Sequence, residues 1–448
     1  MSLLKKTLAG IALLTLFGVA PACAGGMNLL RDEEIEQALK TMSLPVFNQT
    51  GLDADTIKFV LVDDPEMNAF VAGGRNIFLH TGLILETQTP AELAGVIAHE
   101  AGHIADGHLF RAQAEISSLS LQAMLANLLG VAVAIGTPSP DAGVAIGSLG
   151  ANIANRDFLR HTRTQEGSAD QAGTRYLQKA GLPVSGFLSF MKKLSSQELL
   201  PESRQSQYVR THPMTQDRID FLQHVVDENP QAGTPPAWDE LHRRMRAKLE
   251  GYLFPDRALR EKDDSAATQY GRAIAWFRKG KLDKALAVLD PLLKAEPKNP
   301  YFHELRGQML FENGRIEEAV PAYAQAAKLA PFSGLIRIAY AHSLLESKAN
   351  EKERVAEAIR QLTRALGKEK QMSGPHYLLA VAYGKQGQTG LSNLHLAEEE
   401  LMQNNPVRAK RAARLALSGL KKSTPAYQRT LDILAALEKK EKNPEKND

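Results

Sequence analysis

The chain has 448 residues, which is more than one hydrophobic core usually organises, so two domains are expected. Its 54 basic and 51 acidic residues give a formal charge of +3 at pH 7, which argues against a general electrostatic attraction to nucleic acid. It contains a single cysteine, so no disulfide can form within one chain.

The N-terminus has the three parts of a secretory signal peptide. Two lysines precede an apolar run from Leu8 to Ala20, and an A-x-A cleavage site ends at Ala24. Cleavage there lowers the formal charge to +1 and removes Cys23, which excludes thiol catalysis and leaves a metal, a hydroxyl or a carboxylate as the catalyst. Two alternatives stay open. One is an uncleaved membrane anchor, for which a run of 13 residues is short against the roughly 20 that a span needs; the other is a lipoprotein acylated at Cys23.

Residues 57 to 84 alternate short apolar segments with turn residues, a pattern typical of β-strands. Three strands are predicted, over 59–62, 69–72 and 77–79. A helix is predicted next, from Pro90 to His108. Thr89 can cap its N-terminus, Pro90 suits the first turn, and Glu92 follows closely. We therefore expect a small sheet followed by a helix.

A nearly unbroken apolar stretch runs from Leu119 to Ile135 and resumes at Val144, after a loop that contains glycine and proline. It predicts two apolar helical segments around a loop. These segments form either a buried hairpin or a flap that faces a membrane or a substrate, because large apolar surfaces mark interaction sites. The glycine and proline interruptions argue against a transmembrane span.

Two further features precede the C-terminal part of the chain. A helix is predicted from Glu166 to Lys179, and Gly181 and Pro183 end it. Residues 228–237 are rich in proline and form the best linker candidate.

Beyond about residue 264 the sequence becomes repetitive. Three pairs of residues are each 34 apart: Gly280 and Gly314, Ala285 and Ala319, and Pro297 and Pro331. This period, with Gly, Ala and Pro at those places, is that of tetratricopeptide repeats, in which small residues let two antiparallel helices approach closely. About four units with a degenerate end are expected.

The segment His99-Glu100-Ala101-Gly102-His103 places two histidines four residues apart, so on a helix both imidazoles point the same way and can bind one metal ion. The sequence Glu166-Gly-Ser-Ala-Asp170 follows 63 residues after the second histidine. Two imidazoles and the Glu166 carboxylate leave zinc one open position for water, which is the arrangement of a catalytic zinc site. The sequence therefore predicts a zinc metallopeptidase in which Glu100 is the general base.

Asp170 lies four residues after Glu166 on the same helical face, so it can accept a hydrogen bond from a ligand histidine. An ordinary surface carboxylate is the alternative. The longer motif H-E-x-x-H-x-x-G-x-x-H is not matched, because it needs Gly and His where this chain has Asp106 and Leu109. Three other histidines are expected to be packing or surface residues: His80, His108 and His161.

These motifs resemble those of a known family. The quoted segments, together with Asn68-Ala-Phe70, Gly73-Gly-Arg-Asn-Ile-Phe and Thr81-Gly82-Leu83, are similar to the gluzincin family that contains the heat-shock protease HtpX and the type I CAAX prenyl protease. The resemblance implies an α+β, mostly helical fold: an HExxH zinc metallopeptidase domain with a small β-sheet, followed by an all-α tetratricopeptide-repeat solenoid. The expected bounds are 1–24 for the signal peptide, 25–262 for the peptidase domain and 263–448 for the repeats.

The resemblance also implies residue roles. Three residues are expected to bind zinc, His99, His103 and Glu166, and two are expected to be catalytic, Glu100 and Asp170. The segment Thr211-His212-Pro213 followed by Arg218 is similar to a family segment whose histidine can take the open zinc position and hold the enzyme latent. In the family, the strand before the motif helix can present an edge to an extended substrate, which here is about Gly73 to Leu79.

With a signal peptide in front and repeats behind, the architecture is similar to that of periplasmic family members from Gram-negative bacteria. This implies a zinc endopeptidase and chaperone, with one zinc ion per chain, that degrades misfolded or stalled outer-membrane proteins. The repeats are expected to dock on the outer-membrane barrel-assembly machinery, membrane contact is expected to be peripheral at most, and no nucleic acid is expected. The alternative is a repeat scaffold or chaperone with a largely latent metal centre.

Overall fold

The computed structural model describes residues 28–107, 150–198, 201, 205–229 and 232–442. The predicted signal peptide, His108 and most of the predicted apolar hairpin lie outside this part of the chain and stay predictions. The described residues divide into two compact units on either side of the Gly271–Arg272 bond. No helix in the described ranges is both long and apolar enough to cross a membrane.

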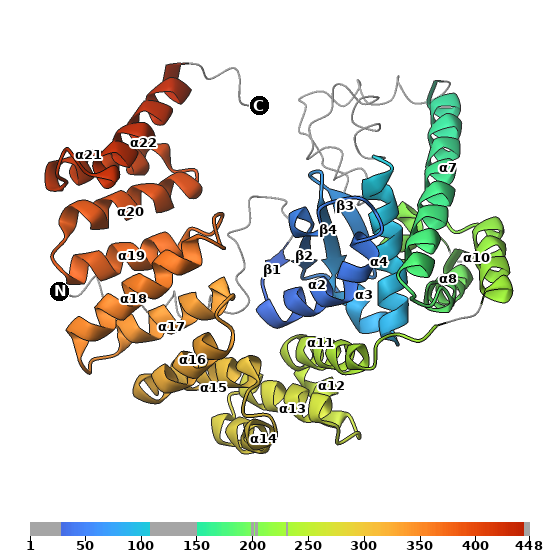
Figure 1. The fold of residues 1–448 in the computed structure, drawn as a ribbon, viewed down its shortest axis with the longest axis horizontal. Coiled ribbons are helices and arrows are strands. Elements are labelled where there is room, and N and C mark those ends of the chain that lie inside the picture. Colours follow the sequence, from blue (N-terminus) through green and yellow to red (C-terminus); the bar gives the residue numbers. More distant parts are fainter. Residues whose placement is uncertain (1–27, 108–149, 199–200, 202–204, 230–231, 443–448) are drawn as a thin grey trace. The chain divides into compact units, whose positions relative to one another are not determined.

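The first unit contains a four-stranded sheet (Figure 1). Its strands are β1 (Leu29–Leu30), β2 (Lys58–Val62), β3 (Ala69–Ala72) and β4 (Asn76–His80), in the order β1-β2-β4-β3. β2 and β4 run parallel, whereas β3 and β4 form an antiparallel hairpin with Gly73 and Gly74 at positive φ in its turn. The three predicted strands are confirmed to within a residue at each end. β1 was not predicted, because two residues are too short to show a period.

The predicted substrate edge from Gly73 to Leu79 is wrong. These residues include most of β4, which lies inside the sheet because all five of its residues pair with β2 on one side and four pair with β3 on the other. The chain leaves β2 for the outer position, forms β3 there, and returns between the two strands as β4. The edge next to the motif helix is therefore β3, and α4 (Pro90–Ala105) contacts β3.

α4 begins where the sequence predicts. The hydroxyl of Thr89 accepts a hydrogen bond from the backbone N–H of Glu92 at 3.2 Å, and the Glu92 carboxylate accepts one from the backbone N–H of Gln88 at 2.8 Å. The helix ends at Ala105, three residues before the predicted end. Every residue from Leu93 to Gly102 is buried, so α4 is the central helix of the first unit.

Other helices surround α4 and the sheet (Figure 1). Those that pack directly on α4 include α2 (Glu33–Phe47), α7 (Gly150–Lys179), α8 (Ser185–Glu198) and α11 (Ala237–Leu253). The remaining ones are α3 (Thr81–Glu86), α9 (Gln207–Thr211), α10 (Gln216–Glu228) and α12 (Pro255–Arg260). α7 ends at Lys179 as predicted, but it already begins at Gly150. The linker candidate at 228–237 connects α10 to α11 within the first unit.

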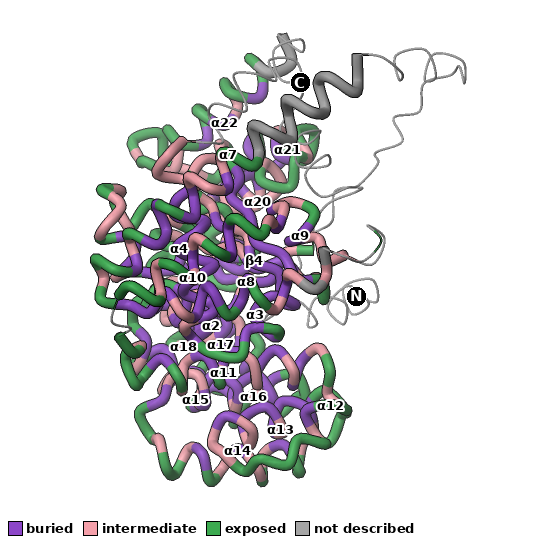
Figure 2. Tube along the Cα trace, turned by 90° about the vertical axis from the view of Figure 1, so that its right-hand side faces the viewer, coloured by how far each residue is buried: buried purple, intermediate pink, exposed green. Residues whose placement is uncertain are grey.

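The second unit is all helical. Within residues 266–442 ten helices follow one another: α13 (Ala266–Arg278), α14 (Leu282–Ala295), α15 (Pro300–Glu312), α16 (Ile316–Leu329), α17 (Gly334–Glu346), α18 (Glu351–Leu366), α19 (Gly374–Lys385), α20 (Thr389–Met402), α21 (Pro406–Gly419) and α22 (Pro425–Lys442). They make five helix-turn-helix units, where the sequence predicts about four and a degenerate end. Gly280, Gly314 and Gly387 take positive φ in three of the turns, and buried and exposed positions alternate along these helices (Figure 2). The division between the two units falls within α13, so the predicted boundary at 262 remains a proposal.

Candidate metal centre

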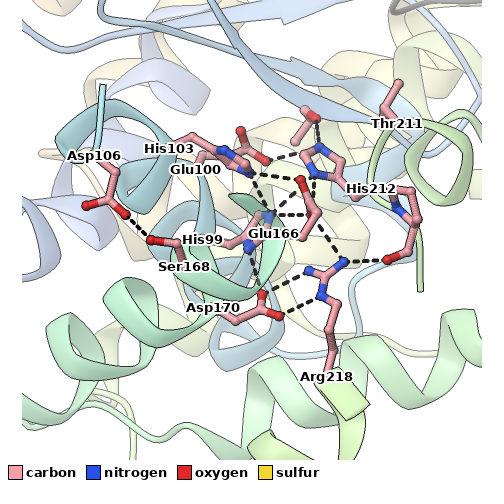
Figure 3. A network of polar contacts seen from close by, with 12 residues as sticks. His99, Glu100, His103, Asp106, Glu166, Ser168, Asp170, Thr211, His212 and Arg218 are labelled. Carbon is pink, nitrogen blue, oxygen red and sulfur yellow. Dashed lines mark hydrogen bonds and ion pairs between the residues drawn. The ribbon is translucent and has the colours of Figure 1, made fainter. Parts of the chain in front are cut away.

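Two helices bring the predicted metal ligands together (Figure 3). α4 carries His99 and His103 one turn apart, and α7 carries Glu166. The Nε2 atoms of the two histidines lie 3.1 Å apart, and the Glu166 carboxylate lies 3.3 Å from each of them. Ligand atoms bound tetrahedrally to one zinc ion at about 2.0–2.1 Å lie about 3.3 Å from one another. The three side chains therefore have the mutual spacing of ligands to a single ion.

His212 completes the cluster. It follows α9, and its Nδ1 atom lies 3.3 Å from Nε2 of His99 and 3.1 Å from the Glu166 carboxylate. One donor atom from each of the four residues lies within 4.8 Å of the others. The other ring nitrogen of His212, Nε2, lies 3.1 Å from the carbonyl oxygen of Ala69, in the edge strand β3. His212 thus contacts both the donor cluster and the sheet edge.

Asn68 fixes this position of α9 against the sheet. Its side chain donates to the Gln207 side chain and accepts from the Thr211 hydroxyl, each at 3.3 Å. The backbone N–H of Tyr208 also donates to the carbonyl of Met67 at 3.0 Å, so a main-chain hydrogen bond supports the contacts of Asn68. Asn68 is fully buried and lies directly before β3, so the Asn-Ala-Phe segment holds the loop that carries the fourth donor.

Asp170 and Arg218 form a second layer behind the cluster. Asp170 lies 2.9 Å from Nδ1 of His99, which leaves Nε2 of that ring toward the other donors. Arg218 donates to both oxygens of the Asp170 carboxylate, at 2.6 and 2.9 Å, and to the Pro213 carbonyl, and lies 3.1 Å from Glu166. The sequence alone gave no signal for these contacts of Arg218, because nothing in its spacing links it to Asp170.

The donor set fits a divalent cation. Burial disfavours charge on His99, but hydrogen bonds that its ring donates to Asp170 and Glu166, with the negative charge of these carboxylates, outweigh burial and raise the pKa of His99 to about 10. Burial likewise opposes charge on Glu166, yet His212, Arg218 and His103 hold the pKa of Glu166 well below its usual value. The carboxylates therefore attract positive charge to the place where the imidazoles meet, and a bound cation would supply it.

Glu100 is the remaining polar group of the site. It is fully buried next to His99 on α4, and neither carboxylate oxygen has a hydrogen-bond partner in the described part of the chain. The His212 ring also approaches this carboxylate, with its Nε2 atom 3.6 Å from Oε1 of Glu100. A buried carboxylate whose oxygens accept no hydrogen bond is costly, so its position next to the donor cluster indicates that it interacts with a bound ligand or reactant.

None of the other histidines whose side chains the structure describes belongs to this cluster. His80 is buried at the end of β4, where one ring nitrogen lies 3.6 Å from the Asp64 carboxylate. His161 lies in α7, of which only the backbone is described at that point.

Two glycines set the distance between the helices that carry the ligands. A Cβ atom on Gly102 would lie 2.7 Å from the Ala169 carbonyl, and one on Gly173 would lie 2.8 Å from the Ala98 carbonyl. α4 and α7 thus touch backbone to backbone beside His103 and Glu166. Any larger residue at these two positions would push the ligands apart.

We expect Gly102→Ala to destabilise the first unit by about 1–3 kcal/mol, because the extra methyl has no room, and to lower the metal content of the purified protein. Gly167→Ala is the matched control, since no described atom lies within 4 Å of a Cβ there. Thermal unfolding and metal analysis measure both effects. Equal behaviour of the two variants would contradict the close-packing account.

Comparison with known proteins agrees with the geometry. Residues 30–226 match Peptidase family M48, and residues 270–334 match the tetratricopeptide repeat. The chain therefore contains a region that matches Peptidase family M48, followed by a region that matches the tetratricopeptide repeat, in the order that the resemblance implied.

Among its relatives is the beta-barrel assembly-enhancing protease of Escherichia coli K12, 24% identical over 314 residues that cover 68% of this chain and 64% of the relative. The protein of the same name from Yersinia pestis is 28% identical over 295 residues, 62% of this chain and 58% of the relative. The match thus spans less than two thirds of these relatives' length. A solved structure, MamA 41-end from Desulfovibrio magneticus RS-1, covers 41% of this chain and 99% of its own at 15% identity, with a TM-score of 0.31.

Proposed function

We propose that this protein is a zinc-dependent endopeptidase. The observation that carries the proposal is a cluster of three imidazoles and a carboxylate beside Glu100, a buried carboxylate with no hydrogen-bond partner among the described residues. His99, His103 and Glu166 would hold the ion. When bound, zinc supplies a Lewis acid that polarises the scissile carbonyl and lowers the pKa of water to about 7.

The residues around the ion have separate tasks in this proposal. Glu100 takes the proton from the attacking water and later gives it to the leaving amine, which is the role of a general base and then a general acid. Asp170 fixes the tautomer and orientation of His99, and Arg218 holds Asp170 in place. Asp170 is thus a positioning residue, because it acts through His99.

An extended substrate would add to the outer edge of β3, which pairs with no other strand in the described part of the chain. Main-chain hydrogen bonds along an edge strand give affinity with little dependence on side chains, which suits the removal of unfolded chains. The carbonyl of Ala69 is one of the acceptors at this edge, and it faces the His212 ring. We propose that His212 keeps the enzyme latent, since it occupies both the fourth donor position and part of the substrate edge.

We expect His212→Ala to raise proteolysis by up to about 30-fold, since two hydrogen bonds worth about 1 kcal/mol each favour the closed arrangement. Initial rates of casein cleavage measure the effect. The exposed His224 provides the control variant, His224→Ala, which should leave the rate unchanged. Unchanged proteolysis by His212→Ala with metal still bound would refute the latch.

We further propose that the protein works in the periplasm of a Gram-negative bacterium on misfolded or stalled outer-membrane proteins. The names of its relatives, the predicted signal peptide and the repeats support this, because repeat solenoids present extended surfaces to partner proteins. The barrel-assembly machinery is the partner proposed for the repeats. The alternative is a scaffold or chaperone with a latent metal centre.

Incubation of the full chain with an unfolded outer-membrane β-barrel protein tests the proposal. We expect cleavage that a chelator stops and that added zinc restores. Binding of the substrate without cleavage, in protein shown to contain zinc, would favour the scaffold instead.

A further inference from the structure

The end of the repeat unit carries an uninterrupted basic segment. From Leu401 to Leu431 the chain has seven lysines and arginines and no acidic residue, although basic and acidic residues are nearly balanced over the whole chain, at 54 and 51. Most of this segment is α21 and the turn that follows it. Four of the seven basic residues lie on α21: Arg408, Lys410, Arg411 and Arg414.

α21 divides sharply into two faces. Its buried positions are all alanine, at 409, 412, 413 and 416, and they pack in one apolar cluster with residues of α20 and α22. Gly390 and Gly419 explain the small residues: a Cβ atom on Gly390 would lie 2.5 Å from the backbone of Gly419, so α20 and α21 are in close contact there. The inner face is thus fully used by packing within the unit.

The outer face combines arginines with aliphatic side chains. Arg411 and Arg414 are exposed, and the Arg408 side chain is 76% exposed, 3.7 Å from Glu400. Val407 is 82% exposed and Leu415 is 51% exposed. Positions 407, 411, 414, 415 and 418 share one side of a helix. Two of the larger aliphatic residues of α21 therefore face solvent among cations, while alanines fill the interior.

We propose that the outer face of α21 binds the surface of an anionic lipid bilayer. Charge complementarity selects an anionic occupant, because lipid phosphates attract a helix that carries several arginines and no acidic residue. The exposed side chains of Val407 and Leu415 favour a bilayer over an acidic protein as the binding partner. Aliphatic side chains between arginines can enter the boundary between lipid headgroups and acyl chains. The helix flank is also convex and about 21 Å long, which suits a flat surface better than a narrow groove.

This surface lies within the repeat unit and is distinct from the metal centre. The contact is peripheral, since α21 lies along the surface and does not span the bilayer. It would hold the peptidase at a membrane without any part of the cleavage machinery.

Vesicle sedimentation with the full-length protein tests the proposal. We expect binding at low salt to vesicles of phosphatidylglycerol and phosphatidylcholine, none to phosphatidylcholine alone, and loss of binding at about 1 M salt, where charges are screened beyond about 3 Å. The readout needs neither metal nor cleavage, so its outcome is independent of the proposed peptidase activity.

Two variants address the face itself. Arg408→Gln combined with Arg411→Gln and Arg414→Gln should weaken vesicle binding about 100-fold, since each basic side chain near an anionic surface contributes about fivefold. Val407→Ser with Leu415→Ser should weaken it about tenfold at unchanged charge. All five side chains lie on the outer face, so both variants should keep the circular dichroism and melting temperature of the wild type.

A variant with the same loss of charge elsewhere in the repeat unit is the control: Lys352→Gln, Arg364→Gln and Lys368→Gln, all exposed. It should bind like the wild type. Equal loss in both triple variants would overturn the proposal, because only net charge would then matter. The proposal would also be overturned if the wild type failed to bind anionic vesicles. If the wild type instead bound immobilised polyglutamate, and the α21 triple variant did not, the face would be assigned to an acidic protein.

Discussion

Glu100→Gln should lower proteolysis by about 10²–10⁴-fold and leave the metal content unchanged. The amide has nearly the shape of the carboxylate, but it cannot take a proton from water. None of the predicted metal ligands is altered, and neither oxygen of Glu100 has a hydrogen-bond partner among the described residues. The substitution therefore removes no hydrogen bond and changes only the 3.6 Å contact with the His212 ring. The expected signature is therefore a folded, metal-loaded and inactive protein.

Cleavage of casein and metal analysis on the same preparation measure this result. Glu86→Gln provides the control, because Glu86 is an exposed carboxylate at the end of α3. It should cleave at the wild-type rate. If Glu100→Gln retained proteolysis, Glu100 could not be the general base.

Arg218→Met should destabilise the first unit by about 3 kcal/mol or more. Arg218 is buried, bonds both oxygens of Asp170 and lies 3.1 Å from Glu166, so its removal leaves two buried carboxylates without their guanidinium partner. The Arg218 guanidinium holds the pKa of Asp170 below its usual value against the effect of burial. Arg218→Met thus leaves buried carboxylate charge without a partner, and this lowers the free energy of unfolding far more than the loss of a surface ion pair does.

Thermal unfolding of the first unit measures the effect, and a drop of about 6–12 °C is expected for this loss in a unit of this size. Arg243→Met is the control, because Arg243 is exposed and pairs with Glu240 on the surface of α11. It should change the melting temperature by no more than about 2 °C. Similar shifts in the two variants would show that Arg218 does not support the metal centre.

The local parts of this structure could be predicted from the sequence. The start of α4 follows from Thr89 and Glu92, three residues apart, and the pair His99 and His103 follows from one turn of helix. The same holds for the turns of the repeats, where Gly280 and Gly314 take positive φ. Each of these features depends on contacts within a few residues, which the sequence displays directly.

Features that depend on distant contacts escaped prediction. The order of the sheet puts β3 at the edge and β4 inside, and nothing in Asn76–His80 distinguishes an inner strand from an edge. The bidentate contact between Arg218 and Asp170 joins residues 48 apart. His212 could be predicted as a site residue only from the family resemblance, since its own sequence context is that of a loop.

The central claim is that His99, His103 and Glu166 hold one zinc ion. Metal analysis of protein purified without chelators, combined with X-ray absorption at the zinc edge, tests it most directly. We predict one zinc per chain with nitrogen and oxygen ligands, and loss of that zinc in Glu166→Ala. Protein that is folded yet contains no stoichiometric metal, or zinc that stays with the same ligands in Glu166→Ala, would contradict the account.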